Sequence, residues 1–238
     1  MLFFFHLFTG IILGFLIADL VHDRRWIVPL VIGAVIPDLI DKTIGFVLFP
    51  TIFGNGRIFM HSLLIFFTIL VSGLIIWKRW SHPAILGVAI GILSHQILDL
   101  MWNVPSTWFF PLFGTFHFTH PGNYPVTVFT SDISSHSEWI LAAIIAIIII
   151  LFFFFQRYQR LVFGFKKIWE WILGAGSIIL FVLSGVAIGV GLIPVKGILT
   201  SSFRFFGWAS QVEFLFGGII FLLCSYLLWR MRLNLING

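Results

Sequence analysis

Residues 91–100 read Gly-Ile-Leu-Ser-His-Gln-Ile-Leu-Asp-Leu, near the end of a long apolar run. His95 and Asp99 are four residues apart, so on a helix their side chains would share one face, a turn from each other. One helix can offer two ligands to a divalent metal in this way. A carboxylate among apolar residues is costly unless paired, and the two side chains could instead bond to each other and join two membrane helices. The stretch alone leaves both interpretations open.

The composition is that of an integral membrane protein. Of the 238 residues, 60% are hydrophobic and 10% are charged, and several apolar runs are long enough to cross a bilayer. We therefore predict an all-α, polytopic transmembrane bundle of about seven helices, with the lipid bilayer as its partner. The net charge of +5 does not indicate nucleic-acid binding, because the basic residues cluster at predicted helix ends. The oligomeric state stays open.

The apolar runs and the turn residues between them set the boundaries of the predicted helices. The seven ranges are about 2–20, 26–49, 58–77, 83–102, 137–155, 168–192 and 207–229. We predict two parts, a domain of residues 1–155 that carries the polar residues and a two-helix extension of residues 156–238.

The second predicted helix carries two carboxylates just after Pro37, where a kink is expected. Asp38 and Asp41 are three residues apart and share a helix face. They need a counter-charge in apolar surroundings, which a metal ion would supply. Lys42 is the alternative for one of them, although it cannot easily serve both.

The longest connection, residues 104–135, is rich in proline and aromatic residues and holds no Lys or Arg. Such a segment fits a cap at the membrane interface over a site better than a disordered linker. It contains His117 and His120, to which the sequence assigns no role. Asp132 and His136 close it, again four residues apart.

The basic residues alternate between the two sides of the predicted bundle. Ten of the fourteen lie on one side, which the positive-inside rule assigns to the cytoplasm. The N-terminus is therefore expected outside and the C-terminus in the cytoplasm. Polar side chains that only join helices would be expected at various depths in the membrane. Ligands of one metal centre have to lie at the same depth, even when they come from five successive helices. The polar residues expected in the outer half are His6, Asp38, Asp41, Arg57, His61, His95, Asp99, His117, His120, Asp132 and His136.

These residues predict a metal centre of imidazole and carboxylate ligands, a set that suits zinc, manganese or iron. We expect zinc, as one to three ions. Asp41 is a predicted catalytic residue that would hold or bridge metals. Arg57 is the other predicted catalytic residue. It lies one turn before His61 on the predicted helix and could bind a phosphate with two N–H groups, or it could be an interfacial arginine. The ligands predicted from helices one to four are His6, Asp38, His61, His95 and Asp99.

An ordered set of motifs in residues 1–155 resembles the YdjM-like family of inner-membrane metal-dependent hydrolases. The motifs are a histidine near the N-terminus, Pro-Asp-x-x-Asp at 37–41, Arg-x-x-x-His-Ser at 57–62, Ser-His-x-x-x-Asp at 94–99 and Trp-Phe-Phe-Pro at 108–111. The resemblance implies a multi-pass protein of the prokaryotic plasma (inner) membrane and a metal-dependent hydrolase.

The ligand order is also similar to that of the secreted zinc-dependent phospholipases C and related nucleases, which cleave phosphoesters. Asp132 and His136 stand where that resemblance implies a second pair of metal ligands, but in reversed order. The expected function is hydrolysis of a lipid or membrane-associated phosphoester at the outer face. The alternative is a non-enzymatic membrane protein that binds or transports cations. The few polar residues in the cytoplasmic half of the predicted helices favour the enzyme.

The topology can be tested with reporter fusions. Reporters placed after Gly238 and within residues 112–122 should lie on opposite sides of the membrane, because the basic residues alternate between the sides. A phosphatase reporter that is active only outside and a fluorescent reporter that folds only in the cytoplasm measure this. The same side for both insertions would contradict the seven-helix topology.

Overall fold

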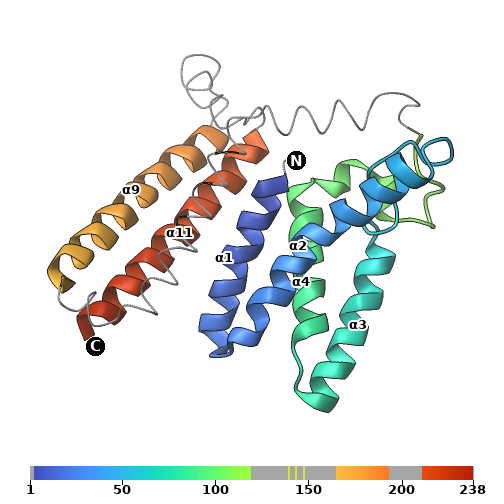
Figure 1. The fold of residues 1–238 in the computed structure, drawn as a ribbon. Helices are drawn as coiled ribbons and strands as arrows, with labels where there is room; N and C mark the ends of the chain where they lie inside the picture. The colour runs from blue at the N-terminus through green and yellow to red at the C-terminus, as the bar shows by residue number, and fades with distance from the viewer. Residues whose placement is uncertain are drawn as a thin grey trace. The chain divides into compact units, whose positions relative to one another are not determined.

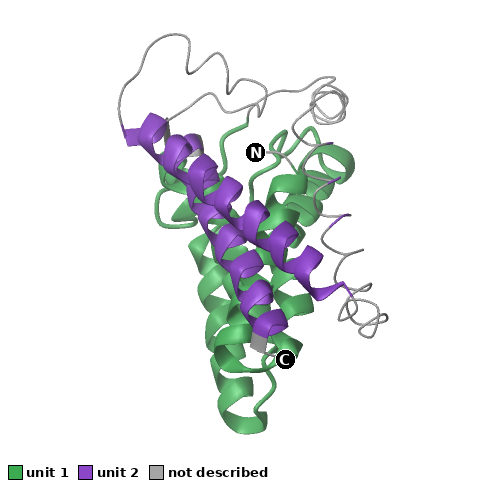
Figure 2. Cartoon of the chain, turned by 90° about the vertical axis from the view of Figure 1, so that its left-hand side faces the viewer, with its two compact units in different colours: residues 1–138 green, residues 139–238 purple. Residues whose placement is uncertain are grey.

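The computed structural model describes residues 3–118, 165–192 and 211–237, together with Trp139, Ala143 and Ile147. Every regular element among these residues is helical, which confirms the all-α prediction. The chain divides into two compact units, residues 1–138 and 139–238 (Figure 2), and each is described by itself.

The first unit is a bundle in which α2 packs against α1 and α4, and α3 packs against the other side of α4 (Figure 1). A 3-10 turn precedes α2, and a π-helical turn prolongs it, so that the chain is helical without a break to Leu48. The elements are α1 (Phe3–Val21), η1 (Arg24–Trp26), α2 (Ile27–Lys42), η2 (Thr43–Leu48), α3 (Leu63–Trp80), α4 (Ala84–Leu98), η3 (Met101–Asn103) and α5 (Pro105–Trp108).

Four of the described helical stretches are long and apolar enough to cross a membrane. They are α1, α3, Lys166–Leu192 and Phe214–Ile236. Helix α4 is apolar but has only 15 residues, and α2 has 16. Helix α4, which contacts both α2 and α3, is thus the shortest of the four long helices described in the first unit.

Glycines allow the backbones of α2 and α4 to lie in contact. A Cβ atom at Gly33 of α2 would collide with the carbonyl group of Val88, and one at Gly91 of α4 would collide with the carbonyl oxygen of Leu30. Small residues at helix interfaces permit this close approach inside membranes. The contact fixes the position of the helix that carries the motif of residues 91–100.

The connection between α1 and α2 is closed by Asp23. Its side chain accepts hydrogen bonds from the backbone N–H and from Nε of Arg25, each at 3.0 Å. The side-chain bond from Arg25 is the main cause that lowers the pKa of the exposed Asp23 carboxyl, so this group stays ionised at neutral pH.

The third helix begins later than the sequence predicts. We expected it from residue 58, but α3 begins at Leu63, and residues 58–62 are not α-helical. Ser62 is the N-cap, and its hydroxyl accepts the N–H of Ile65 at 3.4 Å. The expected helical spacing of Arg57 and His61 is therefore wrong, and the two residues belong to a connecting loop.

The second unit contains two long, packed helices, α9 (Lys166–Leu192) and α11 (Gln211–Asn237). The hydroxyl of Ser225 donates to the carbonyl oxygen of Ser177 at 2.7 Å between them. The predicted fifth helix, residues 137–155, lies mostly outside the described residues, but Trp139, Ala143 and Ile147 are helical. The described residues of this unit contain no group of metal-ligating side chains.

The close contact between α2 and α4 at their glycines predicts how a substitution there changes the stability of the protein. Gly91→Ala should lower the free energy of unfolding by about 1–3 kcal/mol, because the added methyl group has to separate the two backbones. Gly189→Ala in α9 is the control, since nothing described lies within 4 Å of a Cβ atom there. Thermal unfolding in detergent, followed by circular dichroism, measures both. Equal stability of the two variants would contradict the close approach.

Candidate metal centre

Four predicted ligands meet at one end of the first bundle. Asp38 comes from α2, His61 from the loop before α3, His95 from α4, and Asp99 from the residue after α4. One ligand atom from each lies within 4.8 Å of all the others, and all four residues are buried. Among the described residues, this is the group of acidic and histidine side chains that could hold a metal ion.

The hydrogen bonds of the two histidines determine which ring nitrogen carries the proton. Nδ1 of His95 lies 2.8 Å from the carbonyl oxygen of Ala34, which can only accept, so this Nδ1 donates. Nδ1 of His61 lies 2.7 Å from Oδ2 of Asp41, which already accepts backbone N–H groups, so this Nδ1 also donates. In neutral rings, both Nε2 atoms therefore present lone pairs.

These lone pairs point at each other and at two carboxylates. The two Nε2 atoms are 3.1 Å apart, and Oδ1 of Asp38 lies 3.8 Å from each of them. Oδ2 of Asp99 lies 3.6 Å from Nε2 of His61. Four acceptors repel one another unless a cation lies between them, and one proton can serve only two. Ligands about 2.1 Å from a tetrahedral metal are about 3.4 Å apart, so the observed distances fit a metal ion.

Asp41 holds His61 in place and does not belong to this group. It is completely buried. Its carboxylate accepts the backbone N–H groups of Ile58 at 2.8 Å, Met60 at 3.0 Å and His61 at 3.2 Å, besides the bond from the imidazole. A carboxylate behind a ligating histidine fixes its tautomer and makes it a stronger ligand. The placement gives Asp41, a predicted catalytic residue, a positioning role.

His6 lies beside the group, on α1. Its ring stacks on that of His95 with centroids 3.9 Å apart, and its Nε2 lies 3.2 Å from Oδ1 of Asp99. Its Nδ1 is buried and has no hydrogen-bond partner among the described residues. His6 therefore faces Oδ1 of Asp99, whereas His61 faces Oδ2 of the same carboxylate. This position is compatible with the prediction that His6 is a ligand of the same centre.

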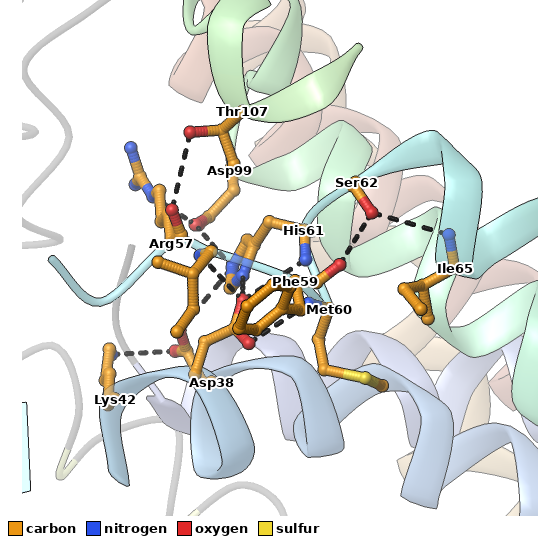
Figure 3. Close-up of polar contacts among 12 residues, drawn as sticks. Asp38, Lys42, Arg57, Phe59, Met60, His61, Ser62, Ile65, Asp99 and Thr107 are labelled. Atoms are coloured by element: carbon orange, nitrogen blue, oxygen red, sulfur yellow. Dashed lines mark hydrogen bonds and ion pairs between the residues drawn. The ribbon is translucent and has the colours of Figure 1, made fainter. Parts of the chain in front are cut away.

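Two cationic side chains, those of Lys42 and Arg57, pair with the carboxylates of the centre (Figure 3). Nζ of Lys42 lies 2.8 Å from Oδ2 of Asp38, and Nε of Arg57 lies 2.8 Å from Oδ2 of Asp99. Both cationic side chains are about one-third exposed, whereas the carboxylates are buried. Lys42 thus serves one carboxylate only, as its single positive charge suggests.

Sequence reasoning missed Gln96, which braces the loop that carries His61. Its side-chain Nε2 donates to the carbonyl oxygens of Met60 at 3.1 Å and Ser62 at 3.2 Å, and its Oε1 accepts the indole N–H of Trp108 at 3.0 Å. The signal in the sequence was an amide side chain within an apolar run, because such a group has to find hydrogen-bond partners.

The remaining predicted residues lie mostly outside the described part of the chain. Asp132, His136 and His120 are not described. His117 is exposed, and its backbone carbonyl accepts the side-chain N–H of Asn55 at 2.9 Å.

Comparison with known proteins supports the family resemblance that the motifs of residues 1–155 indicate. Residues 1–163 match the family described as YdjM inner membrane protein, which is more than half of the chain. This chain belongs to the YdjM inner membrane protein family. No curated protein and no solved structure matches it. The YdjM match includes every residue of the candidate metal centre.

The role of Asp41 in this YdjM protein can be measured directly. Asp41→Asn removes the charge behind His61 and leaves one of the bound N–H groups facing another donor, so metal affinity should fall about 10–100-fold. Competition with a chelating dye measures the affinity. Asp23→Asn, which removes an equal charge from the exposed Arg25 pair, should leave it unchanged. Equal affinities in the two variants would remove Asp41 from the centre.

Proposed function

We propose that this YdjM protein is a membrane-embedded, metal-dependent hydrolase that cleaves a lipid or other membrane-associated phosphoester. One observation carries the proposal: the buried ligand atoms of Asp38, His61, His95 and Asp99 converge, with the histidine protons held on the far sides of the rings. In a purely structural cluster, ligand atoms that face one another would lower the stability of the fold. A hydrolytic metal site requires this arrangement.

The donor set supports zinc. Two imidazole nitrogens and two carboxylate oxygens suit a tetrahedral zinc ion, and each imidazole has the hydrogen-bonded Nδ1 that ligating histidines usually have. A bound zinc ion would supply a water of lowered pKa and would polarise a phosphoryl oxygen. Asp132 and His136 stay candidate ligands for a further ion.

The length of α4 supports a site in the outer half of the membrane. The 15 residues of α4 span about 22 Å, less than the hydrocarbon core of about 30 Å. If Lys78 and Arg79 hold the start of α4 at the cytoplasmic surface, the centre at its other end would lie in the outer half of the bilayer, about 8 Å below the outer edge of the hydrocarbon core. We place the site at the outer face of a prokaryotic inner membrane on this basis and on the basic-residue asymmetry.

Cation transport is less well supported. A transport path needs polar groups that continue through the bundle. In residues 3–118, the buried polar side chain away from the centre is that of Thr9, which donates to the carbonyl of Phe5 in its own helix. The other buried polar side chains of this range belong to the centre or to the loops around it.

The remaining roles follow from position. Arg57, partly exposed beside Asp99, would grip the phosphate, and Asp41 would keep His61 in its ligating tautomer. Residues 1–155 would form the hydrolase domain. Residues 156–238 would form a membrane extension without catalytic residues.

The test uses the full chain purified in detergent. Wild-type protein should contain stoichiometric zinc and hydrolyse a phospholipid or a soluble phosphoester, and a chelator should abolish turnover until zinc is returned. His95→Ala should lose both the metal and the turnover, because it removes a buried ligand. Elemental analysis and an ester-hydrolysis screen measure these outcomes.

The matched control is His82→Ala, an exposed histidine next to α4 that should keep both properties. Turnover that survives in His95→Ala would assign the activity to another site or a contaminant. A zinc-loaded wild-type protein that hydrolyses no ester would reject the hydrolase and favour the cation-binding alternative.

A further inference from the structure

The two cations of the metal centre belong to one partly open region. The stem of Lys42 packs against the residue before Arg57, since its Cγ lies 3.0 Å from the position that a Cβ atom would take at Gly56. Lys42 lies beside Asp38 and Arg57 beside Asp99 (Figure 3). Lys42 is 33% exposed and Arg57 is 36% exposed, so ligands from outside can reach both.

Both side chains have donors that the described residues do not use. Arg57 contacts Asp99 through Nε, and its two terminal nitrogens make no hydrogen bond within the described part of the chain. The ammonium group of Lys42 has three donors, one of which bonds Asp38. The unused terminal N–H groups of an arginine form the fork that binds two oxygens of one anion.

The charge of the centre favours an anion once a metal is bound. Three carboxylates, those of Asp38, Asp41 and Asp99, face two cationic side chains. With neutral histidines the site carries one net negative charge, and a divalent ion makes it positive by one. A partly buried site of this kind is stabilised by a negatively charged ligand.

We infer that Lys42 and Arg57 form an anion-binding site, for a phosphate group, on the exposed side of the metal centre. The inference rests on the proposed function and adds Lys42 to Arg57 as a second residue that holds the phosphate of the substrate. Two cations on separate elements and a metal ion make three positive contacts. This number matches the several oxygens of a phosphate better than the two oxygens of a carboxylate. The phosphate belongs to a lipid headgroup or to a soluble ester.

The experiment measures binding of inorganic phosphate to zinc-loaded full-length protein by calorimetry. Lys42→Met should weaken phosphate binding about ten- to a hundredfold, because one charged hydrogen bond is lost. Arg57→Lys keeps the charge but loses the fork, and it should also weaken binding. Lys78→Met, which removes an exposed charge at the end of α3, is the control and should bind like wild type. Zinc content, measured in each sample, should not change.

A second arm replaces phosphate with phosphatidic acid in mixed micelles. If inorganic phosphate binds and Lys42→Met weakens this binding, a soluble phosphate is sufficient for the site. If only the binding of phosphatidic acid is weakened by Lys42→Met, the site requires a lipid headgroup. The inference is overturned if neither probe binds the zinc-loaded wild type, or if Lys42→Met binds as tightly as wild type. Phosphate binding that depends on Lys42 without turnover of any ester would reject the hydrolase and retain the anion site.

Discussion

The burial of two carboxylates and two imidazoles at one point is the constraint that the first helical unit has to satisfy. Each uncompensated buried charge would cost several kcal/mol, a large part of the stability of a small protein. Asp38 and Asp99 each receive a cation, and Asp41 receives backbone N–H groups. The Nε2 lone pairs of His61 and His95 are left facing each other, which only a further positive charge can relieve.

The scaffold meets this constraint by close helix contact and by an irregular loop. Gly33 and Gly91 let α2 and α4 approach until Nδ1 of His95 reaches a carbonyl group of α2. The loop before α3 is not α-helical, and the backbone N–H groups of its residues Ile58, Met60 and His61 bind the carboxylate of Asp41. Non-helical backbone is tolerated inside a membrane when protein groups satisfy it, and Asp41 satisfies three N–H groups of this loop.

Aromatic side chains attach the segment after α4 to the same loop. The ring of Phe59 packs edge-on against Phe110 and Phe116, with centroids 6.1 and 5.0 Å apart, and Trp108 bonds Gln96 from the same segment. The segment predicted to cap the site therefore contacts Phe59 directly, and it reaches the carbonyl oxygens of Met60 and Ser62 through Gln96. Lys42 and Arg57 are partly exposed polar side chains beside the candidate metal ligands Asp38 and Asp99.

The sequence by itself determined the helical membrane class and the residue types of the candidate metal centre. Apolar runs of spanning length force helices in a bilayer, and a four-residue spacing forces His95 and Asp99 onto neighbouring turns. Only the tertiary structure decided which residues share the centre. The role of Asp41 depends on backbone groups 17 to 20 residues away, and that of Gln96 on a loop 34 to 36 residues away. The periodicity of apolar residues along the sequence does not predict such contacts, because they form only when α2, α4 and the loop before α3 pack together.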